Sequence, residues 1–436
     1  MKGVPAGMMD RFRHYWEFVR TSLWFVPVLM GAGAVALAIA LLTWGTGIPE
    51  DTSSYWLLYA GNTENARELL SALLSGMITM TSLVVSITMV VLTLAAGQIG
   101  PRLIRTFIQD RVTQAVLGLF LADILYLLVV FRTIDGEQLE NVPHLAVSMG
   151  TGITALCLFV LLFYVHRLAR SIIYDNVIQN VAAELRHTVD YLLPEDTRPR
   201  FWPTDVGSDF RWVALGKDGY VQALNLDALV AAARQADAVI RLEVGPGDYV
   251  IGEGEHVAVH PASAFTEEVC KRICGAFIVG SERTAAQDIE FGIRQLVEIA
   301  TRALSPGLND VFTALAVIDN LSSSLAYIFQ RGLEPPVQCD EGGAVRLVRV
   351  VPDYHGIIGM AFDQIRQAGS GHAAILIRLT EAIARLTPCI RTEALREPLL
   401  EQLEMILAAG EQNITMSRDL NLLRARWRHA RDRLER

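Results

Sequence analysis

The hydrophobic pattern of the first 166 residues contains four long windows that carry almost no charge. They span residues 23–44, 69–96, 112–131 and 142–165, and Asp123 is the only acidic or basic side chain in any of them apart from the titratable His144. About 20 apolar residues in a helix suffice to cross a bilayer core. Because backbone polar groups in lipid must be satisfied within the segment, each window predicts a membrane-spanning helix. The chain is therefore expected to be an integral membrane protein.

The charges between the windows alternate in sign. Basic residues precede the first window, fill the second loop and follow the fourth window: Lys2, Arg11, Arg13, Arg20, Arg102, Arg105, Arg111, Arg167 and Arg170. The first and third loops are mainly acidic: Glu50, Asp51, Glu64, Glu68, Asp135, Glu137 and Glu140. Basic loops remain in the cytoplasm, so four spans with both termini cytoplasmic are predicted. Residues 5–20 predict an interfacial helix or a simple extension of the first span.

Length and composition divide the 436 residues into parts. We expect a four-helix transmembrane domain at 1–170, a connecting helix and linker at 171–204, a β-rich module at 205–262 and a helical cytoplasmic domain at 263–436. The fold class is thus an α-helical membrane protein followed by an α+β cytoplasmic region. A net charge of −9 argues against nucleic-acid binding. The five cysteines are expected to remain reduced, without disulfides.

Periodicity predicts the elements of the cytoplasmic region. Strands are expected at 212–215, 220–224, 240–244, 249–251 and 256–259, with a short helix at 227–236. Helices are expected at 266–274, 284–304, 310–330, 355–368, 372–387, 391–409 and 414–435.

The second span carries a stripe of hydroxyl side chains. Their spacing of three or four residues puts them on one helical face: Ser71, Ser75, Thr79, Ser82 and Ser86. This hydroxyl stripe is typical of a water-facing wall of a pore. It is more typical of a helix-packing seam, because small residues allow transmembrane helices to approach closely.

Asp123 lies in the middle of the third span. A carboxyl group at this depth is costly and normally faces protein or a water-filled cavity. It could bind a cation, relay a proton, or be protonated and bonded to hydroxyls of the second span. We assign it to the same candidate pore or packing face.

The cytoplasmic region contains one dense polar cluster, which we call the elbow. It consists of Arg283, Gln287, Asp288, Arg294, Ser305, Asn309 and Asp310. Asn309 is expected to cap the following helix, with Asp310 in its first turn. Caps and a tight turn explain the cluster structurally; a ligand or subunit site lined by Arg283, Asp288 and Arg294 is the functional alternative.

Catalytic and cofactor motifs are missing from the sequence. It lacks the phosphate-binding loop, the dinucleotide glycine fingerprint, the zincin helix and the nucleophile elbow, so we expect no enzyme and no cofactor. A weak candidate for zinc combines His256, His260, Cys270 and Cys274. Its spacing is unusual and buried free cysteines are common, so we expect no metal site.

Two stretches resemble a known family. They are residues 81–107, which contain the end of the second span and Gly-Gln-Ile-Gly-Pro-Arg, and residues 283–314, which contain Arg-Ala-Leu-Ser-Pro-Gly-Leu-Asn-Asp. Both are similar to the domain-of-unknown-function 2254 family of bacterial membrane proteins. The resemblance covers nearly the whole chain and implies a membrane protein without an established activity. The family typically continues Asn-Asp-Pro, whereas Val311 follows here.

These observations favour a channel-like or transport-related protein of the bacterial inner membrane. Four spans are few for a monomeric pore, so this hypothesis requires a homo-oligomer in the bilayer, with an ion or small solute as cargo. The cytoplasmic region would regulate or assemble it. The alternative is a membrane-anchored sensor or scaffold that binds a ligand or partner through the helical cytoplasmic domain.

Overall fold

The computed structural model describes residues 24–44, 59, 61–99, 111–134, 143–171, 174–193 and 208–436. The expected interfacial helix at 5–20 and the loop containing Arg102 and Arg105 lie outside these ranges, as do most of the acidic loops and residues 172–173 and 194–204 of the connecting helix and linker. The chain divides into two compact units, residues 1–173 and 174–436.

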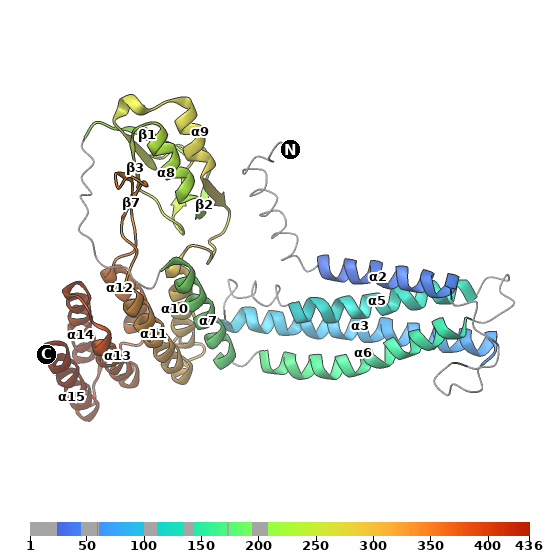
Figure 1. The fold of residues 1–436 in the computed structure, drawn as a ribbon. Helices are drawn as coiled ribbons and strands as arrows, with labels where there is room; N and C mark the ends of the chain where they lie inside the picture. The colour runs from blue at the N-terminus through green and yellow to red at the C-terminus, as the bar shows by residue number, and fades with distance from the viewer. Residues whose placement is uncertain are drawn as a thin grey trace. The chain divides into compact units, whose positions relative to one another are not determined.

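In its described residues, the first unit contains four long helices (Figure 1): α2 (Phe25–Trp44), α3 (Thr63–Ile99), α5 (Arg111–Ile134) and α6 (His144–Ser171). They coincide with the four predicted windows. Helix α5 contacts each of the other three. Its buried residues include Phe120, Tyr126 and Leu127, and they form the core of the unit with apolar side chains from its neighbours.

The outer surface of this unit is apolar. Leu29 on α2 is 63% exposed, and Phe159 and Leu162 on α6 are 72% and 69% exposed. A surface rich in large exposed hydrophobic side chains is unfavourable in water and favourable in lipid. Exposure and helix length together support a membrane-embedded unit.

The second unit begins with α7 (Tyr174–Leu192) and continues into the β-rich module. This module contains β1 (Arg211–Val213), β2 (Gly219–Leu224), α8 (Leu226–Gln235), β3 (Val239–Leu242), β4 (Tyr249–Val250), β5 (Val257–His260), the 3-10 helix η3 (Ala262–Ala264), α9 (Glu267–Gly275) and β6 (Phe277–Gly280). Two further strands, β7 (Val337–Cys339) and β8 (Val345–Arg349), come from beyond the predicted 205–262 module.

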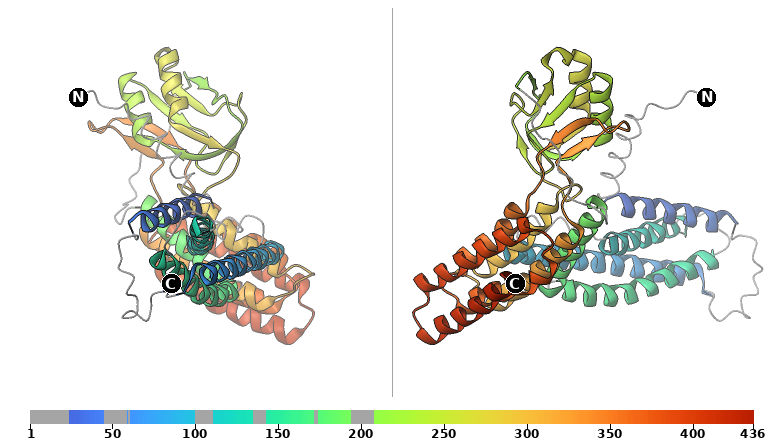
Figure 2. Two further views of the ribbon diagram at one scale, coloured as in Figure 1. Left: turned by 90° about the vertical axis from the view of Figure 1, so that its right-hand side faces the viewer. Right: turned by 60° about the vertical axis from the view of Figure 1, so that its left-hand side comes forward.

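The strands form two sheets. The first has the order β1-β5-β3-β8-β7, and the second has the order β4-β2-β6. All pairs are antiparallel except β3 with β8. Helix α8 packs on β3 and β8, with α9 beside it (Figure 2). The residues between them form the core of the module, in which Leu229, Ile240 and Leu347 are completely buried.

The remaining elements form a helical bundle. They are α10 (Ile289–Ala303), α11 (Val311–Arg331), α12 (Tyr354–Ala368), α13 (Ala373–Leu386), the 3-10 helix η4 (Thr387–Cys389), α14 (Glu393–Asn413) and α15 (Ser417–Leu434). Their bounds follow the predicted helices closely, except that α10 begins at Ile289 rather than at 284. Asp288 accepts a hydrogen bond from the backbone N–H of Phe291 and so caps α10, which fixes this later start.

Candidate functional site

The hydroxyl stripe lies on the exposed face of α3. Its members are all exposed: Ser71, Ser75, Thr79, Ser82 and Ser86. The opposite face of α3 is buried against α5 and α6 and carries Leu70, Met77 and Val84. The stripe faces away from α5 and α6, so among the described residues it does not pack against another helix of the unit.

This face of α3 remains accessible because its side chains are small and their hydroxyls can form hydrogen bonds within the helix. The Thr79 hydroxyl donates to the backbone oxygen of Ser75 over 2.9 Å, as is common for hydroxyls in membrane helices. Gly76 lies beside the stripe, and a side chain added there would meet nothing within 4 Å. By contrast, Thr88 lies on the packing face, 2.8 Å from the hydroxyl oxygen of Tyr164 on α6. The stripe thus forms an open, weakly polar surface available to another helix or to water.

Asp123 lies in the interior of the four-helix unit rather than on the stripe. It is completely buried, and its Oδ2 accepts a 2.9 Å hydrogen bond from Thr154 on α6. Its Oδ1 is buried without a hydrogen-bond partner among the described residues. The bond therefore comes from the fourth span, and not from the second-span hydroxyls considered from the sequence. The structure does not bring Asp123 together with the stripe.

Sequence reasoning did not identify Thr154. A threonine in an apolar span is unremarkable by itself, since such hydroxyls commonly bond to their own helix. Thr154 is important because the packing of α5 on α6 brings it level with Asp123. The periodicity of neither segment predicts this register.

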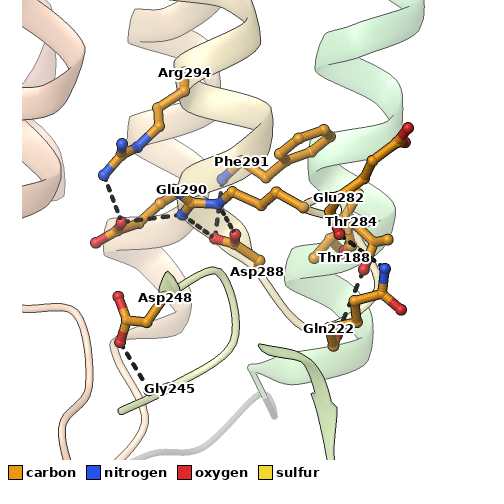
Figure 3. A network of polar contacts seen from close by, with 12 residues as sticks. Thr188, Gln222, Gly245, Asp248, Glu282, Thr284, Asp288, Glu290, Phe291 and Arg294 are labelled. Atoms are coloured by element: carbon orange, nitrogen blue, oxygen red, sulfur yellow. Dashed lines mark hydrogen bonds and ion pairs between the residues drawn. The ribbon is translucent and has the colours of Figure 1, made fainter. Parts of the chain in front are cut away.

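At the start of α10, the elbow forms a network of ion pairs. Arg283 pairs with both carboxylate oxygens of Asp288, and Arg283 Nη2 lies 3.0 Å from Asp288 Oδ1. The carboxylate of Glu290 lies 3.4 Å from Arg283 and from Arg294, between the two cations (Figure 3). Burial alone would lower the pKa of Arg283, but its pairing with Asp288 and Glu290 raises the pKa above the usual range.

A turn of the β-rich module covers this network. Gly247, in this turn, has a φ of +95°, which favours glycine. A Cβ atom built there would come within 2.3 Å of Asp288 Oδ2 and 2.6 Å of Arg283 Nη2. Arg283 and Asp288 are therefore satisfied by each other and closely covered.

Gln287 links α10 to the β-rich module. Its side-chain amide accepts from the backbone N–H of Leu224 over 2.8 Å and donates to the Leu224 oxygen over 3.2 Å. This double hydrogen bond pairs with the backbone of Leu224 at the end of β2, as a residue of a neighbouring strand would. Gln287 thus has a clear structural role.

The remaining elbow residues lie at the opposite end of α10. Asp310 caps α11 by accepting from the backbone N–H of Thr313, whereas Asn309 adopts a left-handed conformation with a φ of +46°. The expected roles of these two residues are therefore shifted by one position. The 15 residues of α10 separate this turn, which includes Ser305, from Arg283 by about 22 Å. The predicted elbow is two separate features.

Three of the four residues considered for zinc, His256, His260 and Cys274, have other partners. His256 Nδ1 accepts from the backbone N–H of Leu215 over 3.3 Å, and His260 Nδ1 lies 2.6 Å from the Asp209 oxygen. The thiol of Cys274, one turn beyond Cys270, lies 3.6 Å from the Ala214 oxygen. In the described part of the chain, no three histidine, cysteine or carboxylate side chains are grouped so that they could hold a metal ion.

Comparison with known proteins identifies the family. The domain-of-unknown-function 2254 family, described as "predicted membrane protein", matches residues 20–385. The chain belongs to this family. It is 27% identical over 435 residues to uncharacterized proteins of Mycobacterium bovis and of Mycobacterium tuberculosis strain H37Rv, covering 95% of this chain and 81% of each relative. No solved structure matches the chain.

In this member of the 2254 family, the departure at Val311 has a simple explanation. Val311 is the first residue of α11, directly after the Asp310 cap. Proline is favoured at the first helical position but is not needed there, because Asp310 already caps the helix through the backbone N–H of Thr313. The substitution leaves the helix start intact.

Proposed function

We propose that this protein is an oligomeric, channel-like protein of the bacterial inner membrane, with the hydroxyl stripe of α3 lining a polar path between copies. The stripe lies on the outer surface of the four-helix unit, where Ser75 and Ser82 are exposed. In this proposal the path lies between copies and does not run through a single four-helix unit. A second copy facing the stripe would pair two polar surfaces and remove them from lipid.

We further propose four spans rather than five. Helix α11 is the fifth helix in the described chain that is long and apolar enough to cross a membrane. It packs, however, between α7, α10 and α13. Asp319 in its middle forms ion pairs with Arg378 and Arg385 of α13, over 3.0 and 2.8 Å. These contacts favour a core helix of a water-exposed bundle, because such pairs would be costly in lipid.

The orientation follows from charge. The basic flanks predict cytoplasmic N- and C-termini, which would place the second unit in the cytoplasm. Its many surface ion pairs, such as Arg424 with Glu411 and Arg431 with Glu435, suit an aqueous compartment.

Asp123 is proposed as a cation or proton site of the same protein. Its unpartnered Oδ1 is buried, so the cost of a charge there must be offset by a bound proton, a cation or a change in packing. Asn at this position would keep the shape and the bond from Thr154 but remove the charge. We expect Asp123→Asn to alter flux at least severalfold if the site participates.

The scaffold alternative places a ligand site at the elbow. Arg283 and Asp288 are paired with each other and covered by the turn at Gly247. A ligand of Arg283 would have to break this pair, which supports a structural role for these two residues.

The test is ion flux from liposomes that contain the purified protein. Ser75→Leu and Ser82→Leu add bulk to the stripe and should reduce flux at least severalfold without changing folding. Ala155→Leu adds similar bulk to an exposed position of α6 and serves as the matched control. Equal flux in the stripe variants, the control and the wild type would refute the proposal.

A further inference from the structure

The carboxyl group of Asp123 is buried with one satisfied and one unsatisfied oxygen. Its Oδ2 accepts from Thr154 on α6, and its Oδ1 has no hydrogen-bond partner among the described residues. Neither α2 nor residues 69–96 of α3 contain a titratable side chain, and no lysine or arginine lies in the four apolar windows. An ionised carboxylate here would therefore be buried without a compensating cation, which is costly in lipid.

The groups around this carboxyl suit a proton better than a metal cation. Calcium and magnesium are held by about six or more oxygen ligands. Asp123 is joined by one hydroxyl, that of Thr154, and the titratable side chains within one helical turn of these two residues are Tyr126 on α5 and Cys157 on α6. The described residues contain no group of three histidine, cysteine or carboxylate side chains that could hold a metal ion. One proton neutralises the carboxylate without further ligands.

Close packing of α5 on α6 extends the polar contacts of this site in one direction. A Cβ atom at Gly150, one turn before Thr154, would lie 3.2 Å from Cε1 of Tyr126. Because Gly150 has no side chain, the Tyr126 ring lies against α6 there. The Tyr126 hydroxyl donates to the backbone oxygen of Ala146, one further turn toward the start of α6, over 2.9 Å.

The start of α6 contains a second unsatisfied buried atom. His144 is the first residue of α6, and its Nδ1 is buried without a hydrogen-bond partner among the described residues. Buried polar atoms of this kind are commonly satisfied by ordered water, which makes about three hydrogen bonds. The Tyr126 hydroxyl oxygen can also accept from such water. Polar groups thus continue from Asp123 to the end of the unit that carries His144.

In the opposite direction, apolar side chains separate Asp123 from the next unsatisfied atom of α5. That atom is Oε1 of Gln114, which lies nine residues away, or about 14 Å along the helix. Between the two residues, α5 buries Val116 and Phe120. The Tyr126 side is therefore the more polar route to Asp123.

We propose that Asp123 carries a proton in the folded protein and exchanges it with water by way of Tyr126 and the end of the unit that carries His144. Side-chain hydroxyls, imidazoles and chains of water transfer protons in proteins, and buried acids form such relays in membrane proteins. The inference rests on the proposed role of Asp123 as a proton or cation site, and it names the proton. It does not require the hydroxyl stripe to line a path.

Infrared spectroscopy of the full chain in liposomes tests both parts of the proposal. A protonated carboxyl group has its own carbonyl band, so subtracting the spectrum of Asp123→Asn from that of the wild type isolates Asp123. On transfer to D2O, the carboxylic proton passes to water and a deuteron replaces it, which shifts the band. Tyr126→Phe removes the hydroxyl from the proposed route. Tyr164→Phe is the matched control, because it removes a buried hydroxyl that contacts Thr88, ten residues beyond Thr154 and away from His144.

We expect the wild type to show a protonated carboxyl band at neutral pH that is absent from Asp123→Asn. Exchange should be at least about fivefold slower in Tyr126→Phe than in the wild type or Tyr164→Phe. Absence of the band, or equal exchange rates in the two phenylalanine variants, would overturn the proposal.

A second variant covers the case in which Tyr126→Phe does not fold. His144→Leu removes the buried nitrogen at the end of the same route, and an exchange rate equal to that of the wild type would overturn the proposal. A wild type that shows the band and the slowed exchange in the variants, but conducts no ions, would refute the channel and support this inference.

Discussion

At the scale of single residues, burial decides what each polar group can do. Asp123 and Asp288 are both buried carboxylates, with exposures of 0% and 4%. Asp288 has Arg283 and the backbone N–H of Phe291 as partners, whereas among the described residues Asp123 has only the hydroxyl of Thr154 and one unpartnered oxygen. The first arrangement is that of a structural ion pair. The second leaves one oxygen free to bind a proton or cation, which supports its proposed role.

The ion pair of Arg283 and Asp288 should be essential for stability. Arg283→Ala would leave Asp288 buried without its cation, and breaking such a pair by removing one partner costs about 3–5 kcal/mol. Arg294→Ala, whose side chain is 51% exposed, should change stability by less than about 1 kcal/mol. Denaturant unfolding of the purified protein measures both. Similar effects of the two substitutions would show that the buried pair is not special.

His256 should make stability depend on pH. Burial lowers the pKa of His256 below its ordinary value of about 6.5. The folded state therefore binds this proton less readily than the unfolded state, so stability falls as the pH decreases below about 6.5 and levels off below the folded-state pKa. Protonation would also remove the acceptor for the Leu215 amide.

His256→Asn retains a side-chain acceptor but cannot be protonated in this range. The thermal midpoint of the wild type should decrease more than that of the variant between about pH 7.5 and about pH 5.5. Because every other histidine is shared, the difference isolates His256. Parallel decreases in the two proteins would contradict the assignment.

At the scale of elements, local hydrophobic periodicity predicted most helices. Several strands were not predicted, because they pair with distant parts of the chain. The charge-free windows identified α2, α3, α5 and α6, although α3 at 37 residues extends well beyond its window. The strands β6, β7 and β8 were not expected. The parallel pairing of β8 with β3 joins segments about 100 residues apart, and no local periodicity records it.

The sequence also predicted that the hydroxyl stripe shares one face of a helix. It did not predict which other helices lie next to that face. Spacing alone shows that Ser75, Thr79 and Ser82 share one side of a helix. Which side of α3 meets α5 and α6 depends on Met77 and Val84, whose burial follows from tertiary packing. This is why the seam and the pore wall could not be separated from sequence.

Close packing of α2 on α5 depends on Gly118. A Cβ atom there would lie 3.1 Å from the backbone Cα of Pro27 and 2.7 Å from the sulfur of Met30. Gly118→Ala should therefore separate the helices and cost about 1–3 kcal/mol. Gly152→Ala on α6 is the matched control, because a side chain there meets nothing within 4 Å. Thermal unfolding in detergent should show a lower midpoint for Gly118→Ala only; equal midpoints would contradict this packing.

At the scale of the whole molecule, an apolar unit of long helices is followed in the chain by a charged unit of sheets and helices. The first exposes large apolar side chains such as Phe159 and Leu162, and the second carries ion pairs across its surface. This contrast fits a membrane domain followed by a water-exposed domain. Among the described residues of the first unit, the stripe on α3 is the polar surface that the proposed second copy would cover, since its hydroxyls gain little from lipid.

The most direct test of this claim is whether water reaches the stripe. Ser82→Cys is reconstituted in liposomes and treated with a charged thiol reagent that cannot enter lipid, while flux is recorded. Ala155→Cys on α6 and the wild type, with its five native cysteines, are treated in parallel. We predict rapid modification of Ser82→Cys and at least a severalfold loss of flux, with neither change in the controls. A thiol at position 82 that stays unmodified, with flux unaffected, would contradict the central claim that the stripe lines a polar path.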